Sequence, residues 1–186
     1  MSPPRRRDAA ATREAILNAG VEAFTRHGYD GVGVREIAQA AGVTAMLVNR
    51  YFGSKEGLFA EVVDVSVTDR TIMIGDKSTL AGDIAAVLVR RTAPEADDLD
   101  PFLLMLRSAP NPRAAEILRA GIEKHVEAHL YDEIPATRGT DRAATTLAVI
   151  AGFWLMRKII GNTALTKSDE ETLTATLEQV FTVLLP

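Results

Sequence analysis

The residues with the clearest capacity for chemistry form one side of a short predicted helix near residue 48. Val48 and Phe52 lie four positions apart, so both turn the same way and are expected to pack inward. The opposite side then carries small, apolar and hydrogen-bonding side chains: Ala45, Met46, Leu47, Asn49 and Arg50, with Thr44 and Tyr51 at its flanks. Outward-facing Met46 and Leu47 gain nothing from bulk water, which favours contact with a partner such as thymine methyl groups in a DNA major groove.

Two short helices around a glycine turn would position these side chains. Apolar residues recur at helical spacing in the preceding segment, at Val34, Ile37, Ala38 and Ala41. Gly42 can take the left-handed conformation that ends a helix, and Thr44 can cap the start of the next one. The pattern therefore predicts a helix-turn-helix.

Other candidate chemistry is weaker. His125 and His129 lie four apart on a predicted helix and could bind a metal ion from one face. A solvated helix face is the favoured interpretation, because no third ligand is implied and the residue after His125 is not the Glu of a zinc-protease motif. The sequence also contains no glycine-rich phosphate loop, serine elbow or kinase signature. We therefore predict no enzyme, no metal site and no cofactor.

The composition is that of a globular chain with room for one or two small domains. It has 186 residues, of which 47% are hydrophobic and 25% are charged. No run approaches the ~18 apolar residues of a membrane span, and the basic N-terminus lacks the apolar segment of a secretion signal, so a cytoplasmic protein is expected. Because the chain has no cysteine, disulfides, thiolate metal sites and thiol redox sensors are excluded.

Charge is divided unevenly along the chain. Residues 1–60 contain eight Lys or Arg and six Asp or Glu, a net charge of +2, whereas residues 61–186 contain thirteen and nineteen, a net charge of −6. A weakly basic head on an acidic body suits a DNA-binding module joined to a body that stays off DNA. A difference this small can also arise without any function.

Helical patterns extend along the whole chain, so an all-α fold is expected. Residues 1–10, with two prolines and three consecutive arginines, are predicted to be a disordered basic arm. Residues 11–56 would form the helix-turn-helix head, residues 57–75 a connecting helix that Ser54 can cap at its start, and residues 76–186 a helical body. The predicted helices of the body cover residues 80–92, 101–107, 112–131, 140–160 and 168–185, the last opening with a capping box at Ser168.

Four segments carry a resemblance to the TetR family of bacterial transcriptional repressors. They are TREAILNAGVEAF (12–24), GYDG (28–31), VREIAQAAGV (34–43) and YFGSKEGLF (51–59), which are similar to that family's first helix, first turn, second helix and entry into the fourth helix. The resemblance implies an N-terminal three-helix DNA-binding domain and a C-terminal helical domain for ligand binding and dimerisation. It further implies that Arg35 contacts a base and that Lys55 contacts a DNA phosphate.

Two positions depart from the family's pattern. Gly33 stands where the family commonly has Thr, and Asn49 stands where it commonly has a phosphate-binding Tyr. Each change removes a hydroxyl group that could bind a phosphate. The resemblance therefore does not predict the operator sequence or the affinity for DNA.

The last two predicted helices carry apolar faces wide enough to serve as an interface. In the TetR family, these helices commonly pair with their symmetry mates, so the resemblance implies a homodimer with its seam along them. The predicted seam residues are Ala148, Ala151, Leu155, Leu173, Leu177, Val180, Phe181 and Leu184. The alternative is that both helices belong to the core of a monomer.

Large apolar side chains are more numerous in the body than its helical stripes require. The family commonly holds an effector among these helices, which implies a pocket for a small apolar or aromatic molecule, with core packing as the alternative. The predicted lining residues are Phe102, Met105, Leu106, Phe153 and Trp154. The polar groups that could orient a ligand are Arg107, His125 and Asn162.

The sequence thus predicts a ligand-responsive, DNA-binding transcriptional regulator that a small molecule releases from a palindromic operator, with repression as its expected action. The rival interpretation is an all-α small-molecule-binding protein or enzyme whose helix-turn-helix is only architectural. Salt-sensitive affinity for DNA separates the two, because the rival would not show it.

Overall fold

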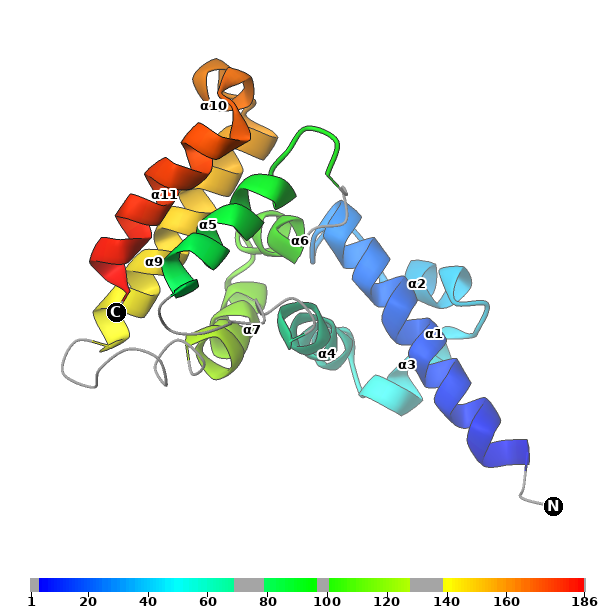
Figure 1. The fold of residues 1–186 in the computed structure, drawn as a ribbon. Coiled ribbons are helices and arrows are strands. Elements are labelled where there is room, and N and C mark those ends of the chain that lie inside the picture. The colour runs from blue at the N-terminus through cyan, green and yellow to red at the C-terminus, as the bar shows by residue number, and fades with distance from the viewer. Residues whose placement is uncertain (1–3, 69–78, 97–100, 128–138, 186) are drawn as a thin grey trace. The chain divides into compact units, whose positions relative to one another are not determined.

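The computed structural model describes residues 4–68, 79–96, 101–127 and 139–185. Every regular element in these ranges is a helix, which confirms the expected all-α class. The chain forms two compact units, and each is described by itself (Figure 1). In the same ranges, no helix is both long and apolar enough to cross a membrane.

The first compact unit combines the N-terminal helices with a later helix pair. Its N-terminal helices are α1 (Pro4–His27), α2 (Val34–Ala40), α3 (Ala45–Phe52) and α4 (Lys55–Thr68). The later pair, α6 (Pro101–Ser108) and α7 (Pro112–Ile122), belongs to this unit because α6 packs against α1 and α7 against α4. The compact units therefore divide the chain differently from the predicted domains, which assigned both of these helices to the body.

The first helix begins earlier than predicted. The structure starts α1 at Pro4, so the expected disordered arm is wrong for residues 4–10. Proline suits the first position of a helix, because its fixed φ is helical and its missing N–H needs no partner there. The arginines and the run Asp8-Ala-Ala-Ala11 then consist mainly of good helix formers, whose intrinsic propensity favours continuing the helix.

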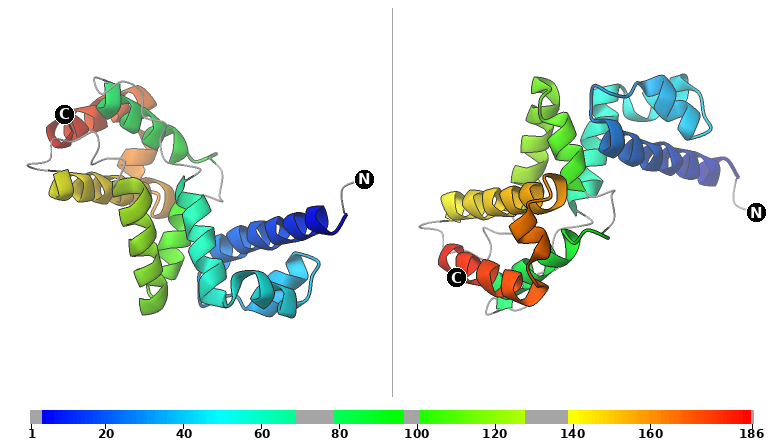
Figure 2. Two further views of the ribbon diagram at one scale, coloured as in Figure 1. Left: turned by 90° about the horizontal axis from the view of Figure 1, so that it is seen from below. Right: turned by 90° about the horizontal axis from the view of Figure 1, so that it is seen from above.

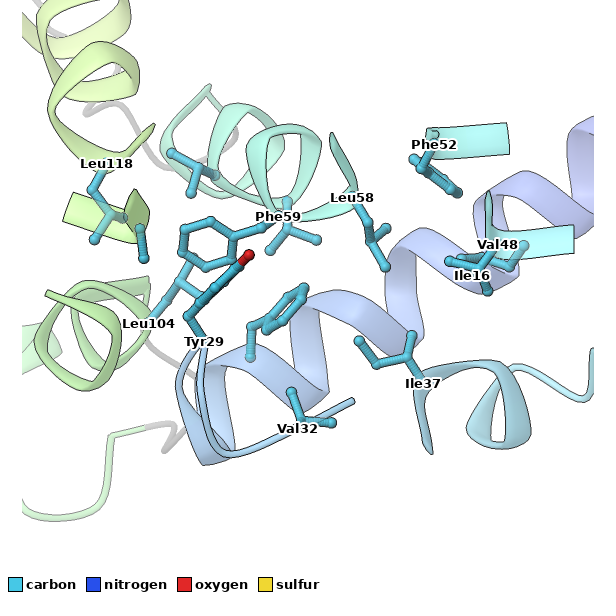
Figure 3. Packing of buried hydrophobic residues seen from close by; sticks show 14 of the residues in the cluster. Ile16, Tyr29, Val32, Ile37, Val48, Phe52, Leu58, Phe59, Leu104 and Leu118 are labelled. Carbon is cyan, nitrogen blue, oxygen red and sulfur yellow. The ribbon is translucent and has the colours of Figure 1, made fainter. Parts of the chain in front are cut away.

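An apolar core holds the helices of the first unit together (Figure 3). Ile16, Ile37, Val48 and Leu58 come from α1, α2, α3 and α4 respectively, and each is fully buried. Burial of a side chain of this size stabilises a fold by roughly 1.5–3 kcal/mol relative to exposure. The helix-turn-helix is therefore held by the apolar positions that the sequence pattern turned inward.

The turn between α2 and α3 forms as the sequence predicted. Gly42 has a φ of 69°, in the left-handed region that favours glycine, and the N–H of Val43 donates to the Ala38 carbonyl at 2.9 Å. Thr44 occupies the N-cap position of α3, but its hydroxyl makes no capping hydrogen bond. That hydroxyl is therefore not committed to the helix and is available to another partner.

The second compact unit is built around α5 (Leu80–Arg91) and α11 (Glu170–Leu184), which pack along each other (Figure 2). Helix α9 (Gly139–Trp154) also contacts α11 and continues into the π-helical turn η3 (Leu155–Ile159). The buried residues of α5 recur at helical spacing on one side: Leu80, Ile84, Ala85, Leu88 and Val89. This side and the apolar stripe of α11 supply much of the core of the second unit.

Two helix starts in the second unit differ from the prediction. Helix α11 is capped by Asp169, whose carboxylate accepts a hydrogen bond from the Thr172 N–H at 2.8 Å, and not by Ser168. A short helix that the sequence analysis missed, α10 (Thr163–Lys167), is capped by the Asn162 side chain. In both cases a short acceptor side chain satisfies N–H groups of the first helical turn.

Turn η3 presents two cations to the C-terminal end of α5. The buried Arg157 guanidinium donates to the Val89 carbonyl at 2.6 Å and to Thr92 Oγ1 at 3.1 Å. Lys158 Nζ donates to the carbonyls of Ala93, Pro94 and Ala96, directly after the helix. Positive charge is favourable there, because the last carbonyls of a helix lack internal partners and carry the negative end of its dipole. The π-helical turn therefore fastens α9 to α5.

Candidate nucleic-acid interface

Helix α3 presents the side that the sequence analysis assigned to a partner. Val48 and Phe52 are buried, as predicted, whereas Met46 is 80% exposed. The remaining residues predicted on α3 and its flanks are exposed (Thr44, Asn49 and Arg50) or half-buried (Ala45, Leu47 and Tyr51). A thioether side chain this exposed would gain by burying its apolar surface in a groove. The contacts of this side with DNA stay a prediction.

Two arginines add positive charge without an internal counter-ion. Arg35 is the second residue of α2, Arg50 lies in the last turn of α3, and both are exposed. Within the part of the chain that the structure describes, neither guanidinium group forms an ion pair or a hydrogen bond. A guanidinium group presents a planar fork of N–H donors that matches a guanine edge or a phosphate.

Gly33 shows how the chain tolerates one departure from the family pattern. It precedes α2 in an extended conformation, with φ −102° and ψ 160°. Its N–H donates to Glu36 Oε2 at 2.6 Å, so the start of α2 is satisfied without a hydroxyl at residue 33. A Cβ added at Gly33 would lie 3.2 Å from the same Oε2, the end of a flexible side chain, so a larger residue would also fit. The fold therefore does not require the missing hydroxyl.

Lys55 occupies the first position of α4 and is half-buried. Its Nζ lies 4.5 Å from the centroid of the Tyr29 ring. The preceding residue, Ser54, caps α4 as predicted, because its Oγ accepts a hydrogen bond from the Gly57 N–H at 3.1 Å. The start of α4 thus combines an ammonium group with the positive end of a helix dipole, an arrangement that attracts phosphate.

Arg13 is a supporting residue that the sequence analysis missed. From α1 it forms an ion pair with Glu61 of α4, and its guanidinium carbon lies 5.0 Å from the ring centroid of Phe52 at the end of α3. One cation therefore links three helices and holds the end of α3 against its neighbours. No local pattern indicates partners so distant in the sequence.

The turn between α1 and α2 is fastened to α6. Arg107 donates through Nη1 to the Thr25 carbonyl at 2.7 Å, and the Tyr29 N–H donates to Ser108 Oγ at 3.0 Å. Gly28 has a φ of 71°, and a Cβ there would lie 2.4 Å from the Arg107 carbonyl oxygen, so only glycine fits. Arg107, which the sequence analysis considered for orienting a ligand, holds this junction.

The predicted pocket residues fall in both compact units. Phe102, Met105 and Leu106 lie on α6, where Met105 packs against the core of the first unit. Phe153 and Trp154 lie on α9 in the second unit, where Trp154 is 3% exposed. A cavity of about 290 Å³ between α1 and α2 has none of the five in its lining. The effector pocket therefore stays a prediction.

The structure corrects part of the predicted dimer seam. Leu173, Leu177 and Phe181 are buried within a single chain, because α11 uses its apolar stripe to cover α5. These three residues belong to the core of the protomer, as in the alternative that the sequence left open. The other predicted seam residues are exposed (Ala148 and Val180) or half-buried (Ala151, Leu155 and Leu184).

Only one histidine of the candidate metal-binding pair lies within the described residues. His125 is half-buried in the π-helical turn η2 (Glu123–Glu127), which continues α7, and His129 lies outside the described residues. Among the residues that the structure does describe, no group of three or more His, Cys, Asp or Glu is placed to hold a metal ion.

Two family models match the chain. The model described as bacterial regulatory proteins, tetR family, matches residues 16–62, which include the helix-turn-helix. The model described as tetracyclin repressor-like, C-terminal domain, matches residues 79–185. Together they cover the proposed DNA-contacting helices and nearly all of the predicted body, residues 76–186.

Curated relatives match over shorter stretches. The HTH-type transcriptional regulatory protein RaaS of Mycobacterium tuberculosis is 58% identical over 53 residues, which are 28% of this chain and 24% of that protein. The HTH-type transcriptional repressor SCO4008 of Streptomyces coelicolor is 37% identical over 68 residues, which are 37% of this chain and 35% of that protein. The matches therefore span about a quarter to a third of each relative's length.

Solved structures share the fold over nearly the whole chain. A TetR-family regulator from Streptomyces coelicolor aligns with a TM-score of 0.61 at 20% identity, covering 94% of both chains. The multidrug binding protein EbrR, complexed with ethidium, aligns with a TM-score of 0.66 at 21% identity, covering 94% of this chain and 99% of that one. Because the C-terminal family model alone matches more than half of the residues and the N-terminal model covers the helix-turn-helix, the chain belongs to the tetR family of bacterial regulatory proteins.

Proposed function

We propose that this chain is a DNA-binding transcriptional regulator that reads its operator through α3. The observation that carries the proposal is the 80% exposure of Met46 on the second helix of a tetR-family helix-turn-helix. Arg35 of α2 and Arg50 of α3 are also exposed, and no described residue neutralises their charges. Apolar and guanidinium groups match two kinds of contact that the major groove offers, thymine methyl groups and guanine acceptors.

The contacts divide into those that specify sequence and those that supply affinity. Arg35 reads a guanine, and Met46 and Leu47 contact thymine methyl groups, so these residues set the preferred sequence. Lys55 binds a phosphate and contributes affinity to every sequence alike, since it releases counterions from the DNA backbone. The curated relatives are named as transcriptional regulators, which supports this function and a place of action in the cytoplasm, beside bacterial DNA.

The proposed regulator is a homodimer whose seam lies on apolar surface that the second unit leaves exposed. The large apolar residues with exposed side chains are Met156 and Ile159 in η3, Ile160 directly after it, and Val180 and Val183 on α11. Large apolar side chains that face solvent gain free energy when an interface covers them. A two-fold dimer would cover them and would match a palindromic operator with its two copies of α3.

A small apolar or aromatic effector is proposed to release the regulator from DNA. The support is the number of large apolar side chains on α6 and α9, together with the fold shared with EbrR, a protein described in complex with ethidium. An effector that favours a conformation poorly suited to DNA lowers operator affinity, and DNA lowers effector affinity by the same factor. Repression relieved by the effector is the regulatory outcome that follows.

Selection of bound duplexes from random DNA tests the proposal. We expect enrichment of an inverted repeat whose half-sites are spaced by about one helical turn or a multiple of it. Affinity for the recovered duplex should fall steeply as salt is raised. Failure to enrich any sequence, with no salt-dependent binding, would favour the rival of an all-α ligand-binding protein or enzyme.

Emission from Trp154 tests the effector separately, because it is the only tryptophan in the chain. A library of apolar and aromatic compounds should contain one that shifts this emission and raises the melting temperature. At a ligand concentration of 100 times Kd, the stabilisation should be about 2.7 kcal/mol. The same compound should weaken operator binding. A compound that binds without this effect would show that effector binding is not coupled to DNA binding.

A further inference from the structure

Lys55 differs from other cations beside α4 in having no acidic partner. Arg13 pairs with Glu61, and Arg113 lies 4.0 Å from a carboxylate oxygen of Glu56. Within the described ranges, the Lys55 ammonium group has no such partner, and it lies 4.5 Å from the ring centroid of Tyr29. A lysine at the first position of a helix is also disfavoured by the helix dipole, so the helix itself does not explain this residue.

The ring beneath Lys55 is held on several sides. Tyr29 is 8% exposed, its ring stacks on Phe24 with centroids 6.1 Å apart, and it forms a T-shaped pair with Phe59 with centroids 5.0 Å apart. The Tyr29 N–H donates to Ser108 Oγ on α6 at 3.0 Å, in a buried hydrogen bond. Burial, followed by the charges of nearby acids, raises the Tyr29 pKa, so the ring stays a neutral phenol near pH 7. The ring face is therefore a fixed, uncharged support.

We propose that Tyr29 is a positioning residue for DNA binding, which holds the Lys55 ammonium group over its ring without neutralising it. A carboxylate partner would also hold the lysine, but it would cancel the charge that attracts a phosphate. A ring face restrains the cation through its quadrupole and leaves the full positive charge in place. The lysine then loses less side-chain freedom when DNA binds. This inference rests on the proposed function, in which Lys55 contacts a phosphate.

The hydrogen bond from the Tyr29 N–H to Ser108 Oγ connects the residue that supports Lys55 to helix α6. Because the Tyr29 backbone is fastened to α6, a movement of α6 relative to α1 would shift the ring and loosen Lys55. The phosphate contact is thereby linked to a helix that carries three of the predicted pocket residues, Phe102, Met105 and Leu106.

A double-mutant cycle on DNA affinity tests the positioning role. Tyr29→Phe keeps the ring face and should bind the selected duplex within about twofold of the wild type. Tyr29→Leu removes the ring face and should weaken binding by roughly 2- to 10-fold, the effect of ordering one lysine side chain on binding. In the Lys55→Ala background, Tyr29→Leu should produce no further loss. An equal loss in both backgrounds, or no loss in either, would overturn the inference.

Proton NMR of the free protein tests the contact without DNA. The ε-methylene protons of Lys55, assigned through their absence in Lys55→Arg, should be shifted upfield by the ring current of Tyr29. The shift should persist in Tyr29→Phe and disappear in Tyr29→Leu. If Tyr29→Leu does not fold, Ser108→Ala replaces it in the cycle and should weaken binding in the same direction by a smaller factor, again only when Lys55 is present.

The two proposals fail in different ways. An unshifted Lys55 signal in the wild type would overturn the positioning role while leaving DNA binding intact. A wild type that shows the shifted signal but binds no DNA would instead overturn the proposed function, and with it the role assigned to the held lysine.

Discussion

Helices α3 and α11 are both amphipathic, yet they use their apolar residues in opposite ways. Helix α3 buries Val48 and Phe52 in the first unit and leaves Met46 80% exposed. Helix α11 buries its stripe, including Leu177, within the same chain against α5. The period of a pattern identifies the residues that share a side of a helix. It does not identify whether the same chain, a second copy or DNA covers that side.

The largest expected effect comes from placing a charge on each side of α11. Leu177→Asp puts a carboxylate at a position that is only 7% exposed within one chain, and should lower the free energy of unfolding of the second unit by at least about 3 kcal/mol. Val183→Asp is the matched control, because Val183 is 72% exposed. It should change the free energy of unfolding of the single protomer by less than about 0.5 kcal/mol, apart from the stabilisation that the dimer adds.

Denaturant unfolding and sedimentation separate these two outcomes. Val183→Asp should remain folded and convert dimers into monomers, if the seam covers that side of α11. A Leu177→Asp variant that keeps wild-type stability would show that α11 does not bury its apolar stripe inside the protomer.

Replacing an arginine by methionine should affect stability in one unit and DNA binding in the other. Arg157→Met removes a buried cation that donates to the Val89 carbonyl and to Thr92, and should lower the stability of the second unit by about 2 kcal/mol. Arg50→Met removes an exposed cation of α3, and should weaken DNA binding with little change in stability. Thermal unfolding and fluorescence anisotropy with the selected duplex give the two measurements. A large loss of stability in Arg50→Met would show an internal role for that residue.

Two cations of the first unit are expected to make different kinds of contact with DNA. Arg35→Ala should cost about 1–3 kcal/mol of binding at the preferred sequence and relax the preference at one base pair. Lys55→Ala should weaken all sequences alike and reduce the slope of log affinity against log salt by about one. Titrations at several salt concentrations, on the selected duplex and on a scrambled one, measure both. Identical behaviour of the two variants on every sequence would contradict the division between specificity and affinity.

The smallest effect concerns the caps of the two helices. A hydrogen bond from the Thr172 N–H lowers the pKa of Asp169 below its usual value of about 3.9. The folded chain therefore keeps this carboxylate ionised where the unfolded chain protonates it. Its contribution to stability is present above about pH 4 and is lost as the pH falls through the folded-state pKa.

Urea midpoints between about pH 6 and pH 3 measure this contribution of Asp169. The midpoint of the second unit should fall less steeply with acid in Asp169→Asn than in the wild type. Thr44→Ala is the control on α3, because the Thr44 hydroxyl makes no capping bond, and it should leave the acid dependence unchanged. Equal acid slopes in the wild type and Asp169→Asn would show that the Asp169 cap does not contribute to the pH dependence of stability.

The sequence predicted what depends on local pattern. The all-α class, the glycine turn at Gly42 and the inward positions Val48 and Phe52 follow from helical periodicity and backbone preference, and the structure confirms them. The serine cap at Ser54 belongs to the same group, because a cap and its partner lie within one turn.

The sequence did not predict what depends on distant partners. The link from Arg13 to Phe52 and Glu61 joins segments with no common pattern. The burial of Leu177 in the protomer was equally hidden, because a core stripe and a dimer stripe share the same period. The early start of α1 at Pro4 was missed for another reason, since three arginines were interpreted as disorder although arginine is a good helix former.

Site-specific photo-crosslinking identifies which surface of the chain meets DNA. A benzoylphenylalanine placed at Met46, and a second one placed separately at Val183, report what each exposed side touches in the complex with the selected duplex. We expect a crosslink from residue 46 to DNA and a crosslink from residue 183 to a second copy of the chain. A chain that crosslinks to DNA from residue 183, or from neither position, would contradict the claim that the exposed side of α3 is the surface that reads DNA.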